Sequence, residues 1–307
     1  MSWFEGFPAR TITIHDGARD IDLYVRTGGR AGGPPLLLLH GYPQCHAIWH
    51  RVVARLGAQY ALVIPDLRGY GRSAKPDGGP DHSAYSKRTM ARDAIHLMDA
   101  LGHTGAFFVA GHDRGGRVAH RLALDHASRV AQLCVLDISP TLTMYEATNF
   151  AFASAYYHWF HLIQPAPIPE RHIGADPIAE LHAKLGGWGS GSLSFFDPRA
   201  MAEYEEAFAD PAVVHATCED YRAAAGIDLE HDRASRAAGQ RLTMPLHVLW
   251  GARGVVHRLF QPLADWRAVS DAEVTGRLLP GGHYLPEEHP GEVVEELLTF
   301  FELPGVE

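Results

Sequence analysis

The chain has 307 residues, 46% of them hydrophobic, so it can bury a sizeable core and is long enough for one large domain with an insertion. The formal net charge of −9 comes without a basic run, which argues against nucleic acid and anionic membrane surfaces as partners. The first residues show no charged leader before an apolar stretch, and no apolar run approaches the ~20 residues that span a bilayer, so we expect a cytoplasmic protein.

Short apolar runs alternate with longer stretches of helical spacing, a pattern typical of strand–helix units that build a mostly parallel sheet. In chain order we expect strands within 34–42 and 61–71, a helix over 87–102, strands within 105–113, 130–140, 245–254 and 274–283, and a helix over 290–302. The first of these helices stops at a glycine and the last starts with a proline, as helices commonly do.

The segment 141–243 has a different character. It is rich in aromatic residues and alanine and lacks consecutive β-branched runs, which indicates helices. An insertion between sheet strands commonly covers the carboxyl edge of the sheet, where open α/β sheets bind their ligands. We therefore predict an α/β core formed by 1–140 and 244–307, with 141–243 as a helical cap.

The stretch VAGHDRGGRVAH, at 109–120, joins an expected strand to an expected helix. Gly111, Asp113 and Gly115 have the spacing of a Gly-x-Ser-x-Gly nucleophile elbow, with a carboxylate in place of the hydroxyl. An aspartate that only caps the helix is the structural alternative. A carboxylate at an elbow can attack carbon and form an ester that water then cleaves. This chemistry suits either displacement of a leaving group from saturated carbon or the opening of an epoxide.

Two arginines follow the candidate nucleophile. A helix N-terminus is partially positive, so the cations of Arg114 and Arg117 in a first helical turn are unfavourable unless something anionic compensates them. Positions i and i+3 share a helix face, so the two guanidinium groups can converge on one planar carboxylate. Pairing with surface Asp or Glu is the structural alternative, more so for Arg117 than for Arg114. The pair favours a small anionic substrate over a neutral epoxide.

A histidine base must approach the ester. His283 follows the last expected strand and two glycines in LLPGGHYLPEEHP, which makes it the best candidate among 20 histidines. The usual place for its acidic partner, after the strand LHVLWG, contains no acid. Asp137, in VLDISP, can supply the charge from a neighbouring loop, although an aspartate before Ser-Pro also forms turns. The backbone N–H groups of Tyr42 and Arg114 can form an oxyanion hole.

Together these residues resemble the α/β-hydrolase superfamily and, within it, the haloacetate dehalogenases that include fluoroacetate dehalogenase. The likeness spans nearly the whole chain, because HGYPQ, DLRGYGRS, GHDRGGR, LDISP, YYHWF, CEDYR, VLWG and GGH occur in the order that the family shows. The resemblance implies that Asp113 is the nucleophile and that Arg114 and Arg117 hold the substrate carboxylate. It implies the acid at Asp137, the base at His283, the α/β-hydrolase fold with an inserted helical cap, and a homodimer.

The halide pocket of that family is formed by a His-Trp pair and a cap tyrosine, which match His158, Trp159 and Tyr221. Without the resemblance, these aromatic residues would be assigned to a helix face in the core. Two positions depart from the family pattern: Arg253, where less charge is expected, and Tyr42, where phenylalanine is more usual. Both departures can alter the entrance to the site.

The sequence therefore predicts a cofactor-independent hydrolase that converts a haloacetate to glycolate and halide, with a small anionic haloacid and water as its partners. An epoxide hydrolase or a haloalkane dehalogenase of the same fold is the alternative within this class, and Arg114 argues against both. A hydrolase-fold receptor that binds a ligand without turnover is the alternative from another class. The presence of both Asp113 and His283 disfavours the receptor, because a receptor needs no base.

The cysteines and histidines indicate neither a disulfide framework nor a metal site. Cys45, Cys134 and Cys218 lie far apart and outside any C-x-x-C pattern, and no H-E-x-x-H or comparable ligand cluster occurs. We expect three buried thiols and no bound metal.

Overall fold

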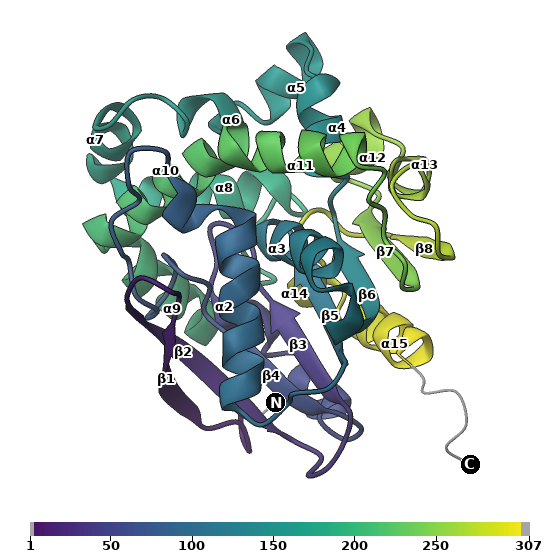
Figure 1. Ribbon diagram of the computed structural model, residues 1–307. Helices are drawn as coiled ribbons and strands as arrows, with labels where there is room; N and C mark the ends of the chain where they lie inside the picture. The colour runs from purple at the N-terminus through teal and green to yellow at the C-terminus, as the bar shows by residue number, and fades with distance from the viewer. Residues whose placement is uncertain (1–2, 302–307) are drawn as a thin grey trace.

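The computed structural model describes residues 3–301, and a single sheet of eight strands lies at its centre (Figure 1). The strand order is β1-β2-β4-β3-β5-β6-β7-β8, antiparallel across β1, β2 and β4 and parallel from β4 to β8. The strands are β1 (Ala9–His15), β2 (Asp20–Gly29), β3 (Pro35–Leu39), β4 (Ala61–Pro65), β5 (Phe107–His112), β6 (Val130–Leu136), β7 (Leu246–Gly251) and β8 (Val274–Leu279). The predicted mostly parallel sheet is confirmed.

Helices flank this sheet and also fill the segment between β6 and β7. The helices outside that segment are η1 (His46–Trp49), α1 (Val53–Leu56), η2 (Ser83–Tyr85), α2 (Lys87–Ala100), α3 (Arg114–Asp125), η3 (Ala127–Arg129), α12 (Val255–Leu259), α13 (Pro262–Arg267), α14 (Leu285–Glu288) and α15 (Pro290–Phe300). Those inside it are α4 (Thr141–Glu146), α5 (Phe150–Ala155), α6 (His158–His161), α7 (Ile168–Gly174), α8 (Pro177–Trp188), α9 (Pro198–Phe208), α10 (Pro211–Ala225) and α11 (Ile227–Ala237). Among the described residues, we find no helix with the length and apolar character that crossing a bilayer requires.

The central strands are apolar along their whole length because both faces of the sheet are covered. In β3, Leu37 and Leu39 belong to one buried cluster, while Leu36 and Leu38 belong to the other. Successive side chains of a strand point to opposite faces, so a strand covered on both sides needs apolar residues at every position. Helices α2 and α3 contribute to the first cluster and α15 to the second.

Several of the helices between β6 and β7 begin with residues that favour a helix N-terminus. Three of them, α8, α9 and α10, start with Asp-Pro, and the carboxylates of Asp176, Asp197 and Asp210 accept backbone N–H groups of the first turn. Proline suits the first helical position because its missing N–H would have no partner there. Figure 1 shows α5, α6, α10 and α11 gathered on one side of the sheet. This arrangement is what a cap over 141–243 would require.

The two antiparallel strands at the edge of the sheet were not among the predicted elements. Strand β2 alternates exposed and buried residues in its first half, and only one residue of β1 is fully buried. Such edge strands lack the continuous apolar run that marks the central strands. The strand expected within 61–71 is also shorter than its range, because β4 ends at Pro65.

Candidate active site

Asp113 lies at the sharp turn between β5 and α3. Its backbone has φ 44° and ψ −113°, a conformation that costs an L-residue about 1–3 kcal/mol. Glycines make the turn possible, because a Cβ on Gly115 would lie 2.4 Å from the backbone oxygen of His40 and one on Gly111 would lie 2.6 Å from that of Gly115. The strained, buried position matches the elbow and not an ordinary helix cap, since the Asp113 side chain accepts no capping bond from α3.

The carboxylate of Asp113 accepts the backbone N–H of Tyr42 at 3.0 Å, through Oδ2. Burial raises the pKa of Asp113, but the nearby charges of His283 and Arg117 lower it by more, so the pKa lies below its ordinary value. The group is therefore ionised at neutral pH, which is the form that can attack carbon. Tyr42 N–H is thus placed against the predicted nucleophile, as an oxyanion donor must be.

His283 and Asp137 come together from the ends of two different strands. Nδ1 of His283 lies 2.6 Å from Oδ2 of Asp137, and Oδ1 of Asp137 accepts the backbone N–H of Gly251 at 3.0 Å. Both side chains are buried. Burial lowers the pKa of His283, but the bond to Asp137 and the charges of Asp137 and Asp113 raise it by more, so the pKa lies above its ordinary value. The loop after β7 contains no acid, and Asp137, after β6, places a carboxylate beside His283 instead.

Arg114 is paired with an acid that the sequence argument did not use. Its Nε donates to Oδ2 of Asp220 at 2.8 Å, and its Nη2 donates to Oδ1 at 2.9 Å, all in the interior. Asp220 therefore compensates the charge of Arg114 from within the protein, which is the structural alternative of pairing with an acidic side chain, here a buried one. Only Nη1 of Arg114 is left without a partner among the described residues.

Arg117 differs from Arg114, because its partners are all neutral. Nη1 donates to the carbonyl of Ser139 at 3.3 Å and to Oγ1 of Thr141 at 3.0 Å, and Nη2 contacts Sδ of Met144 at 3.3 Å. Within residues 3–301, no carboxylate lies in ion-pair distance of this guanidinium, and its Nε has no partner. Burial lowers the pKa of Arg117, yet a guanidinium stays protonated in proteins. Arg117 is a buried cation that an anionic ligand would stabilise.

The three residues assigned to the halide pocket lie against these arginines. The guanidinium carbon of Arg114 is 4.2 Å from the ring centre of Tyr221, and that of Arg117 is 4.7 Å from the ring centre of Trp159. The ring of His158 lies 5.6 Å from Tyr221, and all three side chains are buried. The structure therefore gathers the residues that the resemblance named.

Sequence reasoning missed two further residues at this site. Trp188 lies 4.2 Å from the ring of His158 and 6.0 Å from that of His283, so it joins the base to the aromatic cluster. Asp220 holds Arg114. Asp220 could have been noticed from the sequence, because it directly precedes Tyr221 in CEDYR. The stretch GGWGSG contains nothing that indicates a role for Trp188.

One group of three potential metal ligands occurs in the described part of the chain: Cys45, His46 and Asp66. Nδ1 of His46 is 2.8 Å from Asp66, and its Nε2 accepts from Arg26 at 3.0 Å, so both ring nitrogens are already engaged. Burial raises the pKa of the Cys45 thiol well above its ordinary value, which disfavours the thiolate that binds metals. We interpret this group as structural. All three cysteines are buried and free.

Comparison with known proteins agrees with this geometry. A family model described as the α/β hydrolase fold matches residues 34–290. A fluoroacetate dehalogenase from Burkholderia sp is 43% identical, covering 97% of this chain and 94% of its own, and a soluble epoxide hydrolase from Corynebacterium sp. strain C12 is 32% identical over 91% and 92%. The solved structure of an α/β hydrolase from Nostoc sp PCC 7120 superposes with a TM-score of 0.92 and 48% identity, covering 97% of this chain and 98% of its own.

Proposed function

The chain belongs to the α/β-hydrolase family and within it to the haloacetate dehalogenases, and we propose that it hydrolyses a haloacetate to glycolate and halide through an ester on Asp113. One observation carries this proposal: the buried cation of Arg117, which has only neutral partners, lies close enough to the ionised Asp113 to affect its pKa. A carboxylate on the substrate would supply the missing counter-charge. The α-carbon of a haloacetate would then lie one bond from that carboxylate.

In the first step, a carboxylate oxygen of Asp113 attacks the α-carbon and forms a C–O bond. The carbon–halogen bond breaks, and the halide leaves with its electron pair. Arg117 holds the substrate carboxylate, with Nη1 of Arg114 as a second donor. The lowered pKa of Asp113 keeps this nucleophile ionised. No base is needed for this step.

In the second step, His283 takes a proton from water, and the resulting hydroxide attacks the carbonyl carbon of the ester. The oxygen that gains charge is the one beside the N–H of Tyr42, and the N–H of Arg114 is its proposed second donor. The intermediate collapses, the glycolate oxygen takes the proton from His283, and Asp113 releases its remaining proton to solvent. Ester formation removes the charge of Asp113, which is one cause of the raised pKa of His283. The pKa of His283 therefore falls when the ester forms, and the imidazole loses its proton at a lower pH than in the free protein.

The departing halide must exchange its hydration for hydrogen-bond donors. We assign this role to His158, Trp159 and Tyr221, which offer an imidazole N–H, an indole N–H and a phenol O–H. Burial lowers the pKa of His158 well below its ordinary value, so the ring is neutral. Its Nδ1 has no partner among the described residues. We also propose that α4 to α11 form the cap that brings these donors over Asp113, and that the protein is a homodimer.

Epoxide hydrolysis is the second candidate. The epoxide hydrolase from Corynebacterium is 32% identical to this chain. Burial and then the charge of Asp113 raise the pKa of Tyr221, and burial, then the charge of Asp137 and then that of Asp113 raise the pKa of Tyr156. Such phenols can protonate a ring-opened oxygen. A neutral epoxide would, however, leave the guanidinium of Arg117 without an ion-pair partner in contact with it.

Halide release decides between the two candidates. The purified protein should release halide from fluoroacetate, chloroacetate or bromoacetate, as measured with ion-selective electrodes. It should open styrene oxide at least 100-fold more slowly, which chromatography of the diol would show. Diol formation without halide release would replace the dehalogenase with an epoxide hydrolase, and neither activity would favour the receptor.

A further inference from the structure

Asp220, in cap helix α10, is the centre of a buried polar network that the proposed mechanism does not use. Oδ1 of its carboxylate accepts from Nη2 of Arg114 at 2.9 Å and from Nζ of Lys87, and Oδ2 accepts from Nε of Arg114 at 2.8 Å and from the hydroxyl of Tyr70 at 2.6 Å. A carboxylate has about four acceptor sites, so Asp220 is fully satisfied. None of its surface is exposed.

The carboxylate of Asp220 binds the side chains of the first residues of two core helices. Lys87 is the first residue of α2, and Arg114 is the first residue of α3. A cation at a helix N-terminus opposes the helix dipole, whereas an anion there is stabilised by it. Asp220 therefore supplies one negative charge to two cations that the first residues of these helices carry. Burial alone would raise the pKa of Asp220, but Arg114 and Lys87 lower it far below its ordinary value.

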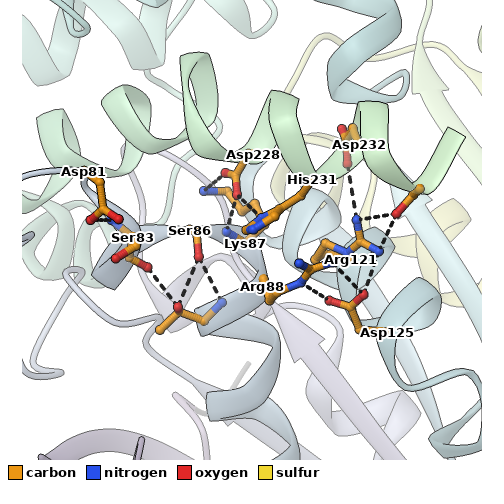
Figure 2. Close-up of polar contacts among 12 residues, drawn as sticks. Asp81, Ser83, Ser86, Lys87, Arg88, Arg121, Asp125, Asp228, His231 and Asp232 are labelled. Atoms are coloured by element: carbon orange, nitrogen blue, oxygen red, sulfur yellow. Dashed lines mark hydrogen bonds and ion pairs between the residues drawn. The ribbon is translucent and has the colours of Figure 1, made fainter. Parts of the chain in front are cut away.

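A second cap helix takes part through Asp228 in α11. The backbone N–H of Lys87 donates to Oδ1 of Asp228 at 2.8 Å, and the two side chains point toward each other in Figure 2. Nζ of Lys87 is 3.6 Å from Oδ2 of Asp228. Burial raises the pKa of Asp228, and the charge and backbone N–H of Lys87 lower it by less. Lys87 thus joins α2 of the core to both α10 and α11.

The network also determines which charges reach the site. Arg114 offers the site only Nη1, because Asp220 takes its Nε and Nη2. Arg117, with neutral partners, keeps its full charge. Tyr221 is the next residue of α10 after Asp220, and its ring lies under the guanidinium of Arg114. The contacts of Asp220 with the core therefore fix the positions of Arg114 and Tyr221 together.

We propose that Asp220 is a positioning residue that docks α10 on the core and sets the charge of the carboxylate site, so that Arg117 alone provides the full positive charge for a monoanion. This inference rests on the proposed function, because it takes the anion to be a haloacetate carboxylate. Lys87 has the opposite effect on the positive charge of the site. It shares the carboxylate of Asp220 with Arg114, so the charge of Arg114 is less completely compensated.

Acetate is a suitable probe, because it has the carboxylate of the substrate and no leaving group. Isothermal titration should show that Asp220→Asn binds acetate about 3- to 10-fold more tightly than the unaltered protein, because removing an anion near the site leaves both guanidinium groups uncompensated. Lys87→Met should bind acetate more weakly by a similar factor. The kcat of Asp220→Asn for chloroacetate should fall about 10-fold, because Tyr221 and Arg114 lose their alignment.

Glu219→Gln is the matched control, since Glu219 is the adjacent acid on α10 and bonds to Arg222 and His82 instead. Its acetate affinity should stay within about twofold of the unaltered protein, by the same Coulomb argument. Equal or weaker acetate binding by folded Asp220→Asn, or an unchanged affinity in Lys87→Met, would overturn the proposal, as would absence of acetate binding by the unaltered protein. If Asp220→Asn does not fold, Lys87→Met decides alone.

The two hypotheses fail separately. Acetate binding needs no turnover, so opposite shifts in the two variants together with no halide release would reject the dehalogenase and keep the role of Asp220. Halide release without opposite shifts in the acetate affinity of the two variants would reject the role of Asp220 and keep the dehalogenase.

Discussion

Asp113 and His283 are buried side by side, yet their pKa values move in opposite directions. After the cost of burial, each group is shifted chiefly by charges of the opposite sign, so the carboxylate pKa falls and the imidazole pKa rises. The resting site therefore holds an ionised Asp113 and a histidine that keeps its proton to a higher pH than a free imidazole does. In the proposed mechanism, the first step needs only the ionised Asp113, whereas the second step needs His283 without its proton.

The pH profile should separate the two steps. The turnover rate should rise with pH as His283 loses its proton, because the base must be neutral. The midpoint should lie below the pKa of His283 in the free protein, since ester formation removes the charge of Asp113. In His283→Asn, ester formation should persist, and mass spectrometry should detect the glycolyl adduct on Asp113 from pH 5 to 9. Absence of the adduct in a folded variant would mean that His283 has another role.

The proposed role of Arg117 can be tested by comparing an anionic substrate with a neutral one. Replacing it with methionine should lower kcat/KM for chloroacetate by roughly 10- to 100-fold, which corresponds to losing one charge-assisted contact of about 1.5–3 kcal/mol. Neutral chloroacetamide should lose much less. Equal losses for the two substrates, measured by chloride release, would show that Arg117 only supports the packing around Trp159.

At the scale of elements, the loop after β8 must hold His283 in register with Asp137. Glu288, in α14, accepts the N–H of Gly282 through Oε2 and that of Tyr284 through Oε1, both at 2.9 Å. His283 lies between these two bonds, and its own N–H donates to the carbonyl of Trp188 at 2.9 Å. The backbone on both sides of the base is therefore fixed by one carboxylate.

Glu288→Gln should lower kcat by about 10-fold, because one of the two N–H groups would then face an amide NH₂ and the loop would shift the base. The acetate affinity should be unchanged, since Arg117 is untouched. Glu292→Gln, a more exposed acid that pairs with His289, is the control. A variant of Glu288 with full kcat would show that the loop is held by other contacts.

At the scale of the molecule, the contact between α11 and the core contains an acid that destabilises the protein at neutral pH. Oδ1 of Asp232 lies 3.7 Å from Nη1 of Arg121 of α3, and a dashed line joins the two side chains in Figure 2. Burial and then the charge of Asp228 raise the pKa of Asp232 to about 6. Because the folded pKa exceeds the unfolded value near 3.9, the folded state binds more protons between these two values. The associated stability is present below pH 3.9 and is lost as pH rises through 6.

Asp232→Asn should therefore raise the free energy of unfolding at pH 8 by about 1–3 kcal/mol and have little effect near pH 4. Urea unfolding at the two pH values would measure this difference. Glu230→Gln changes an exposed acid of the same helix and should have little effect at either pH. A stabilisation of Asp232→Asn that does not depend on pH would contradict the explanation.

Local patterns in the sequence were sufficient for the central strands, the elbow and the candidate nucleophile. Continuous apolar runs mark strands buried on both faces, and the spacing of Gly111, Asp113 and Gly115 follows from how closely the backbone passes itself at the turn. The resemblance to the haloacetate dehalogenases added His158, Trp159 and Tyr221, which no local pattern distinguishes from core. The roles of these site residues remain predictions.

Only the tertiary structure decided how the charges pair. The sequence places Arg114 and Arg117 three positions apart on one helix face, and nothing local separates them. The fold brings Asp220, 106 positions away in the chain, onto Arg114, and it surrounds Arg117 with neutral groups. An ion pair depends on which side chains the packing of distant helices brings within a few ångströms, whereas a strand, a turn or a cap depends on neighbours in the chain. For this reason the sequence by itself determined the candidate nucleophile and its elbow, and the packing of α10 against the core determined which of the two cations has an acidic partner.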